Sequence, residues 1–324
     1  MDTGKSHLIS KYRAAVLALI SAVLWGSAFP VLKLSYAEMH MVPEDLSAKV
    51  VLAGIRFFLA SVLLFGLMLF GRQKPWVGKR LWFWLVLSGL LQISLQYFFF
   101  YNGLAHTTGM KGAVLSSGGT FFVFILAHFF YANDKLNWQK GVGLATGLAG
   151  ILLVNYGKSF TPEFSWQGEG FLIIGGLVSA FGTILSKRLS GSVHALALTA
   201  WQMLLGSLLL IAVGVPGLKL HSMVFTAKAW WLLGYSAFLS AAAFSLYYSV
   251  LKHNKAGEIS VYMFMIPVSG AILSALFVPG EKLTVFMLGA LLLVALGIAA
   301  VNYRSTPEVP VESTVRTMKP KLLK

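Results

Sequence analysis

One apolar segment occurs twice in this chain, and the repeat constrains the fold more than any other feature. Residues 137–156 read NWQKGVGLATGLAGILLVNY, and residues 284–303, 147 positions later, read TVFMLGALLLVALGIAAVNY. The preceding DKL at 134–136 and EKL at 281–283 match in the same register. Both copies are long enough for a membrane-like helix, so we expect two related halves. Repeats in apolar chains are typical of transporters whose site lies between them.

Composition places the chain among membrane proteins. Of its 324 residues, 57% are hydrophobic and only 11% are charged, whereas about a quarter of the residues in soluble domains are charged. The mean hydropathy of +0.76 is too high for a single water-soluble core. The absence of cysteine excludes disulfides, thiolate metal sites and cysteine nucleophiles.

Ten segments approach the roughly 20 apolar residues that a membrane crossing needs. Irregular backbone cannot face lipid, so each segment is expected to be a helix. The first one is too long for a signal peptide and is read as a retained span. The sequence therefore predicts an all-α membrane protein with ten transmembrane helices, arranged as two inverted five-helix repeats. The expected spans are residues 14–34, 49–70, 81–103, 111–131, 138–156, 168–187, 195–214, 229–251, 257–278 and 284–303.

The loop charges predict the orientation. With the N-terminus in the cytoplasm, eighteen Lys and Arg residues fall on the inner side and six on the outer side, as the positive-inside rule requires. Both termini are therefore expected to be cytoplasmic, and five spans per half give the halves opposite orientations. The Lys and Arg residues behind the net charge of +15 lie in short loops between the apolar segments, so this charge reflects the topology. No nucleic-acid partner is expected.

The same boundaries divide the chain into four parts. The C-terminal part is polar, contains three prolines and ends in a basic cluster, so it is expected to be a disordered cytoplasmic tail. The parts are a cytoplasmic N-terminus at 1–13, a first five-helix repeat at 14–157, a second at 168–304, and the tail at 305–324.

Arg56 is the leading candidate for a binding residue, because charged groups at membrane depth are costly. A guanidinium can bind a carboxylate or phosphate through two parallel hydrogen bonds. Snorkelling to the surface, or a structural bond to helix-end carbonyls, is the competing interpretation. At an offset of 146, Arg56 corresponds to Gln202, so a polar group recurs in each half.

Further candidates are polar or aromatic side chains that share helix faces. In the third span Ser88, Gln92 and Gln96 follow each other at spacings of four and form one stripe. This stripe either lines a site or joins helices by hydrogen bonds. The candidate substrate-binding set is Arg56, Gln92, Gln96, Ser117, Thr120 and Gln202, with Trp25 and Tyr247 as apolar walls; packing competes as the role of each aromatic residue.

Pro30 and Pro267 interrupt backbone hydrogen bonding inside spans and are candidate hinges. No Asp or Glu lies clearly inside a span, so the carboxylate relay of proton-coupled pumps is not evident, and His128 is the only titratable relay candidate. The chain has no Walker motif and no metal-ligand spacing. We therefore expect no cofactor, no metal, no catalytic residues and no enzymatic activity.

Several segments resemble the EamA family, the ten-helix branch of the drug/metabolite transporter superfamily. They are WGSAFPVLKLS at 25–35, GIRFFLA at 54–60 around Arg56, and IPVSGAILSALFVPGEKLT at 266–284, with Pro267 at the family's proline position. In the first half the family's glutamate is Asp134 and its proline is Thr120. The resemblance implies a central cavity that excludes the fifth and tenth helices. It also implies export or exchange of small metabolites, often amino acids, by alternating access.

The sequence thus predicts a secondary transporter in the cell membrane, plasma or bacterial inner, for amino acids or related zwitterions. An exporter of drugs or other apolar or cationic compounds is an alternative, and a membrane scaffold or assembly subunit is a non-transport alternative. The expected partners are a small-molecule substrate and the lipid bilayer, with a homodimer left open.

Overall fold

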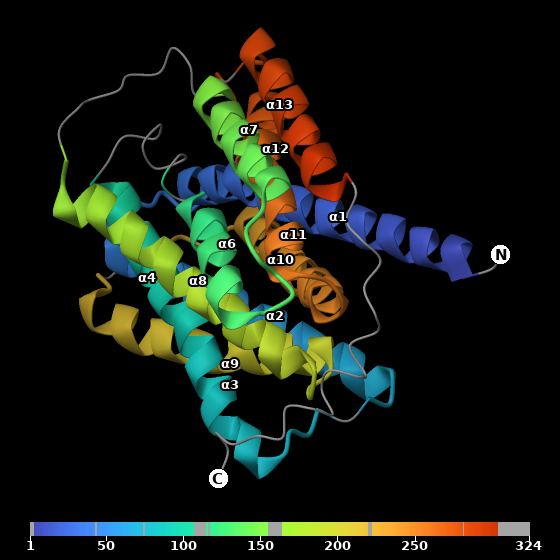
Figure 1. The fold of residues 1–324 in the computed structure, drawn as a ribbon. Helices are drawn as coiled ribbons and strands as arrows, with labels where there is room; N and C mark the ends of the chain where they lie inside the picture. Colours follow the sequence, from blue (N-terminus) through green and yellow to red (C-terminus); the bar gives the residue numbers. More distant parts are fainter. Residues whose placement is uncertain are drawn as a thin grey trace.

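The computed structural model describes residues 3–42, 44–73, 75–106, 115, 117–154, 164–219, 222–280 and 282–303. These residues form helices joined by turns, and this part of the chain contains no β-strand (Figure 1). The α-helices are α1 (Thr3–Glu38), α2 (Leu46–Phe70), α3 (Trp82–Gly89), α4 (Gln96–Ala105), α6 (Gly118–Phe130), α7 (Trp138–Val154), α8 (Phe171–Ser190), α9 (Ala195–Gly214), α10 (Ala227–His253), α11 (Ala256–Ser260), α12 (Met265–Phe277) and α13 (Val285–Asn302). Short 3-10 segments are η1 (Lys79–Leu81), η4 (Val215–Gly217) and η5 (Val261–Phe264), and π segments are η2 (Leu90–Leu95) and η3 (Trp166–Gly170).

Within the described residues, eight helical stretches are long and apolar enough to cross a membrane. The shorter α6 and the 17-residue α7 are also apolar. The all-helical membrane fold is confirmed, whereas the count of ten spans and the inverted repeats stay predictions. Residues 107–114, 116 and 155–163, and the predicted tail, lie outside the described residues. The eight stretches are Tyr12–Glu38, Leu46–Phe70, Lys79–Leu104, Trp166–Ser190, Ala195–Gly217, Ala227–His253, Ala256–Phe277 and Val285–Asn302.

The distribution of side chains is that of a membrane protein. Large apolar residues lie on the outer surface, where the exposed fraction reaches 90% for Phe70, 82% for Trp231 and 75% for Phe129. Many serines, together with Arg56 and Gln202, are buried inside. An apolar exterior of this extent would associate or aggregate in water, but it is solvated by lipid tails.

Helices from the N-terminal part of the chain pack chiefly on helices from the C-terminal part. α2 lies against α9, α1 against α10 and α12, and α7 against α13. Figure 1 shows the α7–α13 pair and the α2–α9 pair on opposite sides of the molecule. Small residues permit this closeness: a Cβ atom on Gly54 would lie 2.5 Å from Ile211 of α9. The interior is therefore built jointly by both parts of the chain.

At the end of the bundle where α10 begins, Glu38 and Asp45 connect the α1–α2 connection to the segment that precedes α10. The Glu38 carboxylate accepts a hydrogen bond from Thr226 Oγ1 at 2.6 Å, and Lys228 Nζ lies 3.0 Å away. Asp45 caps α2 by accepting from the Ala48 amide at 2.9 Å and also accepts from Ser222 Oγ at 2.6 Å. Burial opposes ionisation of Asp45, but these hydrogen bonds outweigh it and hold the pKa of the carboxyl below its ordinary value.

A buried ion pair closes the opposite end of the bundle. Asp134, between α6 and α7, is 1% exposed, and Lys140 of α7 is 4% exposed. Lys140 Nζ lies 2.5 Å from Asp134 Oδ1 and donates to the Lys135 carbonyl at 2.8 Å. The second carboxylate oxygen accepts from the Gly257 amide of α11 at 2.9 Å. This carboxylate therefore connects two segments that lie 123 residues apart in sequence.

Candidate functional site

A cavity of about 330 Å³ lies inside the bundle, between α1, α2, the η2–α4 segment, α6, α8, α10 and the η5–α12 segment. It extends from Tyr36 and Leu104, near the ends of α1 and α4, to Ser260 at the end of α11. No residue of α7, α9 or α13 lines it. Its wall comprises Trp25, Ala28, Phe29, Leu32, Lys33, Tyr36, Arg56, Gln92, Gln96, Tyr97, Phe100, Tyr101, Leu104, Ser117, Gly119, Thr120, Val123, Ser179, Thr183, Phe244, Tyr247, Ser260, Met263, Ile266 and Pro267.

The structure brings most of the predicted binding residues together at this cavity. The residues that line it are Trp25, Arg56, Gln92, Gln96, Ser117, Thr120 and Tyr247. Gln202 is buried away from the lining. Pro267 lines the cavity from the first turn of α12, whereas Pro30 is buried inside α1. A missing N–H is tolerated in a first helical turn, so the local irregularity at Pro267 is the 3-10 segment η5 that precedes it.

The Arg56 side chain is bonded to α10 through its Nε atom alone. Its side chain is 3% exposed, and Nε donates to Ser240 Oγ at 2.7 Å and to the Ser236 carbonyl at 3.2 Å. Ser240 Oγ itself donates to the Ser236 carbonyl at 2.7 Å, which fixes the hydroxyl as an acceptor for Arg56. Within the described residues the two terminal nitrogens have no hydrogen-bond partner. The guanidinium is therefore oriented by its Nε bonds, while its terminal nitrogens keep their hydrogen-bonding capacity.

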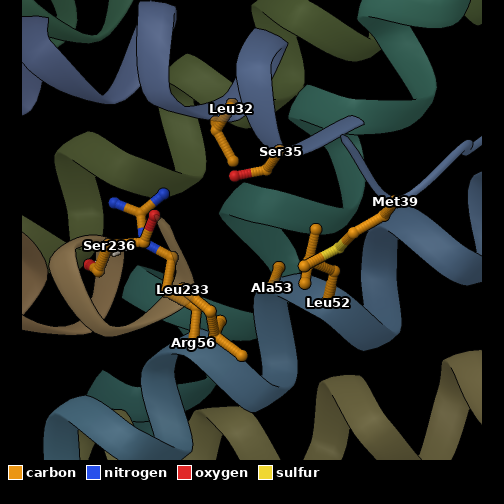
Figure 2. Close-up of a pocket in the computed structure, with 8 residues that line it drawn as sticks. All are labelled: Leu32, Ser35, Met39, Leu52, Ala53, Arg56, Leu233 and Ser236. Atoms are coloured by element: carbon orange, nitrogen blue, oxygen red, sulfur yellow. Dashed lines mark hydrogen bonds between the residues drawn. The ribbon is translucent and has the colours of Figure 1, made fainter. Parts of the chain in front are cut away.

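A second, much smaller cavity lies behind Arg56. It has a volume of about 10 Å³, near that of one water-sized probe. Figure 2 shows Arg56 rising from α2 with its guanidinium beside Ser236, and Ser35 of α1 across the gap. The full lining is Leu32, Ser35, Met39, Leu52, Ala53, Arg56, Leu233 and Ser236. Arg56 and Leu32 line both cavities, so they lie between the two.

Three tyrosines share the cavity wall with Arg56, and none was predicted. They are Tyr36 of α1 and Tyr97 and Tyr101 of α4. A phenol can donate a hydrogen bond to an anion. Tyrosines from two helices and one cation thus line the same cavity.

Aromatic rings form the wall on the α10 side. Trp25 contacts Phe244 edge-to-face with ring centroids 4.8 Å apart, and it contacts Tyr247 at 5.4 Å. Phe57 contacts Tyr97 at 4.7 Å. Such pairs hold each other in place, so this wall offers a preformed apolar surface. The predicted role of Trp25 and Tyr247 as walls fits these positions.

Gln202 belongs to a separate buried polar cluster that joins α3, α8 and α9. Its Nε2 donates to Ser186 Oγ at 2.8 Å and also to Ser88 Oγ. Ser88 and Ser186 contact each other at 3.2 Å. Gln92 occupies the space between this cluster and the cavity, because its Nε2 reaches Thr183 Oγ1 at 3.4 Å. Gln202 therefore joins helices in this structure and does not line the cavity.

His128 lies away from the cavity lining and is engaged by a loop. Its Nδ1 accepts a hydrogen bond from the Leu136 amide at 3.1 Å, and its carbonyl accepts one from Lys135 Nζ at 2.7 Å. Among the described residues the lining contains Arg56 and Lys33 but no Asp or Glu. In the same part of the chain no group of three His, Asp or Glu side chains could hold a metal ion.

The sequence profile of the EamA-like transporter family matches residues 12–156 and again residues 166–303. The chain belongs to this family. The predicted resemblance is confirmed, and the function of the family is membrane transport, as its description states.

Several EamA relatives carry names that agree with this role. The uncharacterized transporter YvbV of Bacillus subtilis is 28% identical over 304 residues, which cover 92% of this chain and 94% of YvbV. The uncharacterized inner membrane transporter YedA of Escherichia coli K12 is 27% identical over 252 residues, 75% of this chain and 71% of YedA. A solved crystal structure with 15% identity has the same fold, with a TM-score of 0.74 over 89% of this chain and 96% of its own.

Proposed function

We propose that this EamA protein is a secondary transporter that exports or exchanges amino acids or related zwitterions through the central cavity. The observation that carries the proposal is Arg56, a buried cation that lines a cavity of about 330 Å³. A guanidinium held through Nε can still offer two parallel N–H donors to a carboxylate. Ligand sites in proteins commonly combine an apolar wall with a few fixed polar groups of this kind.

The remaining lining residues supply the other contacts of the proposed complex. Gln96, Ser117 and Thr120 contribute hydrogen-bonding groups, with Gln92 behind them at the junction with the buried cluster. Trp25 and Tyr247 contact the apolar part of the substrate. Gln202 acts indirectly, because it supports the helices that position Gln92.

The proposed transport cycle is alternating access between two inverted repeats, with both termini in the cytoplasm of a plasma or bacterial inner membrane. In this orientation the cavity extends toward the outer end of the bundle, and contacts at the inner end close it. Besides the Asp134–Lys140 pair, Tyr131 donates to the Ile184 carbonyl at 3.1 Å, and Lys187 Nζ donates to the Asn254 carbonyl. Opening toward the cytoplasm requires these contacts to separate, and bending at Pro30 and near Pro267 is the proposed means.

Transport is proposed to be facilitated or only weakly linked to protons, since the described residues of the cavity lining include no carboxylate. A pH gradient imposed across proteoliposomes should therefore change the initial rate of uptake only slightly. A steep dependence that persists after His128→Gln would contradict this part of the proposal.

The deciding experiment is counterflow of labelled amino acids in proteoliposomes, with wild type compared with Arg56→Ala. Saturable counterflow that is lost in the variant supports the proposal, provided that the variant elutes as a folded species in size-exclusion chromatography. Arg188→Ala is the matched control, because Arg188 lies at the exposed end of α8 and outside the lining. Counterflow that survives in Arg56→Ala would remove Arg56 from the binding site.

Export of drugs or other apolar compounds is the second candidate, favoured by the aromatic wall around Trp25, Phe244 and Tyr247. It predicts that amphipathic drugs compete for counterflow equally well in wild type and Arg56→Ala. The amino-acid proposal predicts that competition depends on Arg56. Adding such a compound to the same assay separates the two.

A further inference from the structure

The charged groups of the cavity are unbalanced. Arg56 and Lys33 are cationic, and none of the described lining residues is acidic. No ion pair within the described part of the chain includes Arg56. A buried cation without a counter-ion is strongly unfavourable. An anion that enters the cavity would remove this penalty.

The surroundings of Arg56 are arranged for an anion. Because Nε is committed to Ser236 and Ser240, the guanidinium plane is fixed and both terminal nitrogens remain for one bidentate partner. Tyr36, Tyr97 and Tyr101 line the same cavity as Arg56, so phenol donors lie in the same wall. A carboxylate has two oxygens and about four lone pairs, so it can accept from the guanidinium and from phenols at once.

No comparable arrangement receives an ammonium group. The amide oxygens of Gln92 and Gln96 have no hydrogen-bond partner, but both atoms are fully buried and are not presented to the cavity. The Gln92 oxygen is packed against Gly182, where a Cβ atom would overlap it. The faces of Trp25 and Tyr247 and the hydroxyl oxygens of Ser117 and Thr120 remain, and each is an uncharged partner that binds a cation more weakly than a carboxylate does. An ammonium group therefore loses water without gaining an equivalent contact.

From this asymmetry we infer that the anionic group is the required part of the substrate and the ammonium group is dispensable. The site takes small organic monoanions, carboxylates with an apolar body, and it accepts amino acids through their carboxylate. The inference rests on the proposed transport function and narrows its substrate class. A monocarboxylate binds more tightly than the amino acid with the same body, and the corresponding amine does not bind.

Two matched series of probes test the inference directly. Leucine, 4-methylpentanoate and 3-methylbutylamine share one aliphatic body; phenylalanine, 3-phenylpropionate and 2-phenylethylamine share one aromatic body. Binding to the purified full-length protein in detergent is measured by titration calorimetry, independently of transport. We expect each carboxylate to have a Kd about tenfold or more below that of its amino acid, a free-energy difference of about 1.4 kcal/mol. Neither amine should bind.

Variants connect this preference to Arg56. Arg56→Gln should abolish carboxylate binding, whereas Arg56→Lys should retain part of it, because a lysine keeps the charge but not the bidentate geometry. Arg188→Gln, outside the cavity lining, should bind as wild type does. The partial function of Arg56→Lys distinguishes loss of the anion partner from loss of folding.

Three results would overturn the inference. They are an amino acid that binds more tightly than its carboxylate analogue, an amine that binds as well as the carboxylate, and binding that is unchanged in Arg56→Gln. If none of the six probes binds while counterflow of another compound is observed, the monocarboxylate class is wrong but transport stands. If the folded protein shows no counterflow of any compound in the amino-acid and drug panels, the proposed function itself fails.

Discussion

Replacing Lys140 by methionine should strongly destabilise the protein. The change leaves the Asp134 carboxylate buried, at 1% exposed, with the Gly257 amide still donating a hydrogen bond to it. Methionine matches the length of the lysine stem, so packing around α7 is largely kept and the missing charge is the main perturbation. The substitution therefore measures the loss of the ion pair without adding the cost of a packing defect.

The expected magnitude follows from burial and geometry. Removing one partner of a fully buried ion pair costs about 3–5 kcal/mol, because the other charge is left without compensation. Both side chains qualify, at 4% and 0% exposed, with a separation of 2.5 Å. At about 2 °C per kcal/mol for a chain of this size, the unfolding temperature should fall by about 6 °C or more.

A double-mutant cycle measures the coupling between the two residues. Thermal unfolding in detergent is followed for Lys140→Met, Asp134→Asn and the double variant. The double variant carries no net buried charge, and an asparagine oxygen can still accept from the Gly257 amide. It should therefore be more stable than Lys140→Met alone. Lys228→Met is the control: its partner is Glu38 and Lys228 is 66% exposed, so unfolding should change little.

A fall of less than about 1 °C in Lys140→Met would refute this reasoning, because such a value is expected of a solvated ion pair. A double variant whose destabilisation equals the sum of the two single effects would also refute it, since the two residues would then be uncoupled.

Two further predictions concern the buried cluster and the loop at the other end. Gln202→Leu should lower the free energy of unfolding by about 1–3 kcal/mol, because it removes the hydrogen bonds to Ser88 and Ser186. The KM of counterflow should stay within about twofold of wild type. A large change in KM without a loss of stability would contradict a supporting role. The low pKa of Asp45 in the fold means that its contribution is complete above its ordinary pKa and is lost as the pH falls through the lowered value. Unfolding temperatures measured from pH 7 down to pH 3 should therefore fall more steeply for wild type than for Asp45→Asn.

The helices could be predicted from sequence because length and hydropathy decide them in a membrane. Their partners could not, since α2 and α9 are both apolar along their length and nothing in either sequence selects the other. The stripe of Gln92 and Gln96 was found by its spacing, although the π segment η2 changes the helical repeat at this point.

The candidate site was only partly predictable. Arg56 was found because a charge inside a span is rare. Tyr36, Tyr97 and Tyr101 were missed because aromatic residues make up 14% of the chain and most of them pack or face lipid. Ser179 and Thr183, four residues apart in an apolar helix, were a usable signal. Gln202 matched Arg56 by position, but only the placement of Ser88 and Ser186 shows that its amide joins helices.

The close packing between the two parts of the chain determines when the protein can assemble. Arg56 and its partner Ser240 are 184 residues apart. At about 5–20 residues per second, a ribosome needs roughly 9 to 37 s to make the intervening chain. α9, at Ala195–Gly214, is made before Ser236 and Ser240 of α10, which hold the Arg56 side chain. The order of synthesis therefore lets α2 meet α9 before the partners of its buried cation exist, so the site is completed after the first contacts between the two parts of the chain.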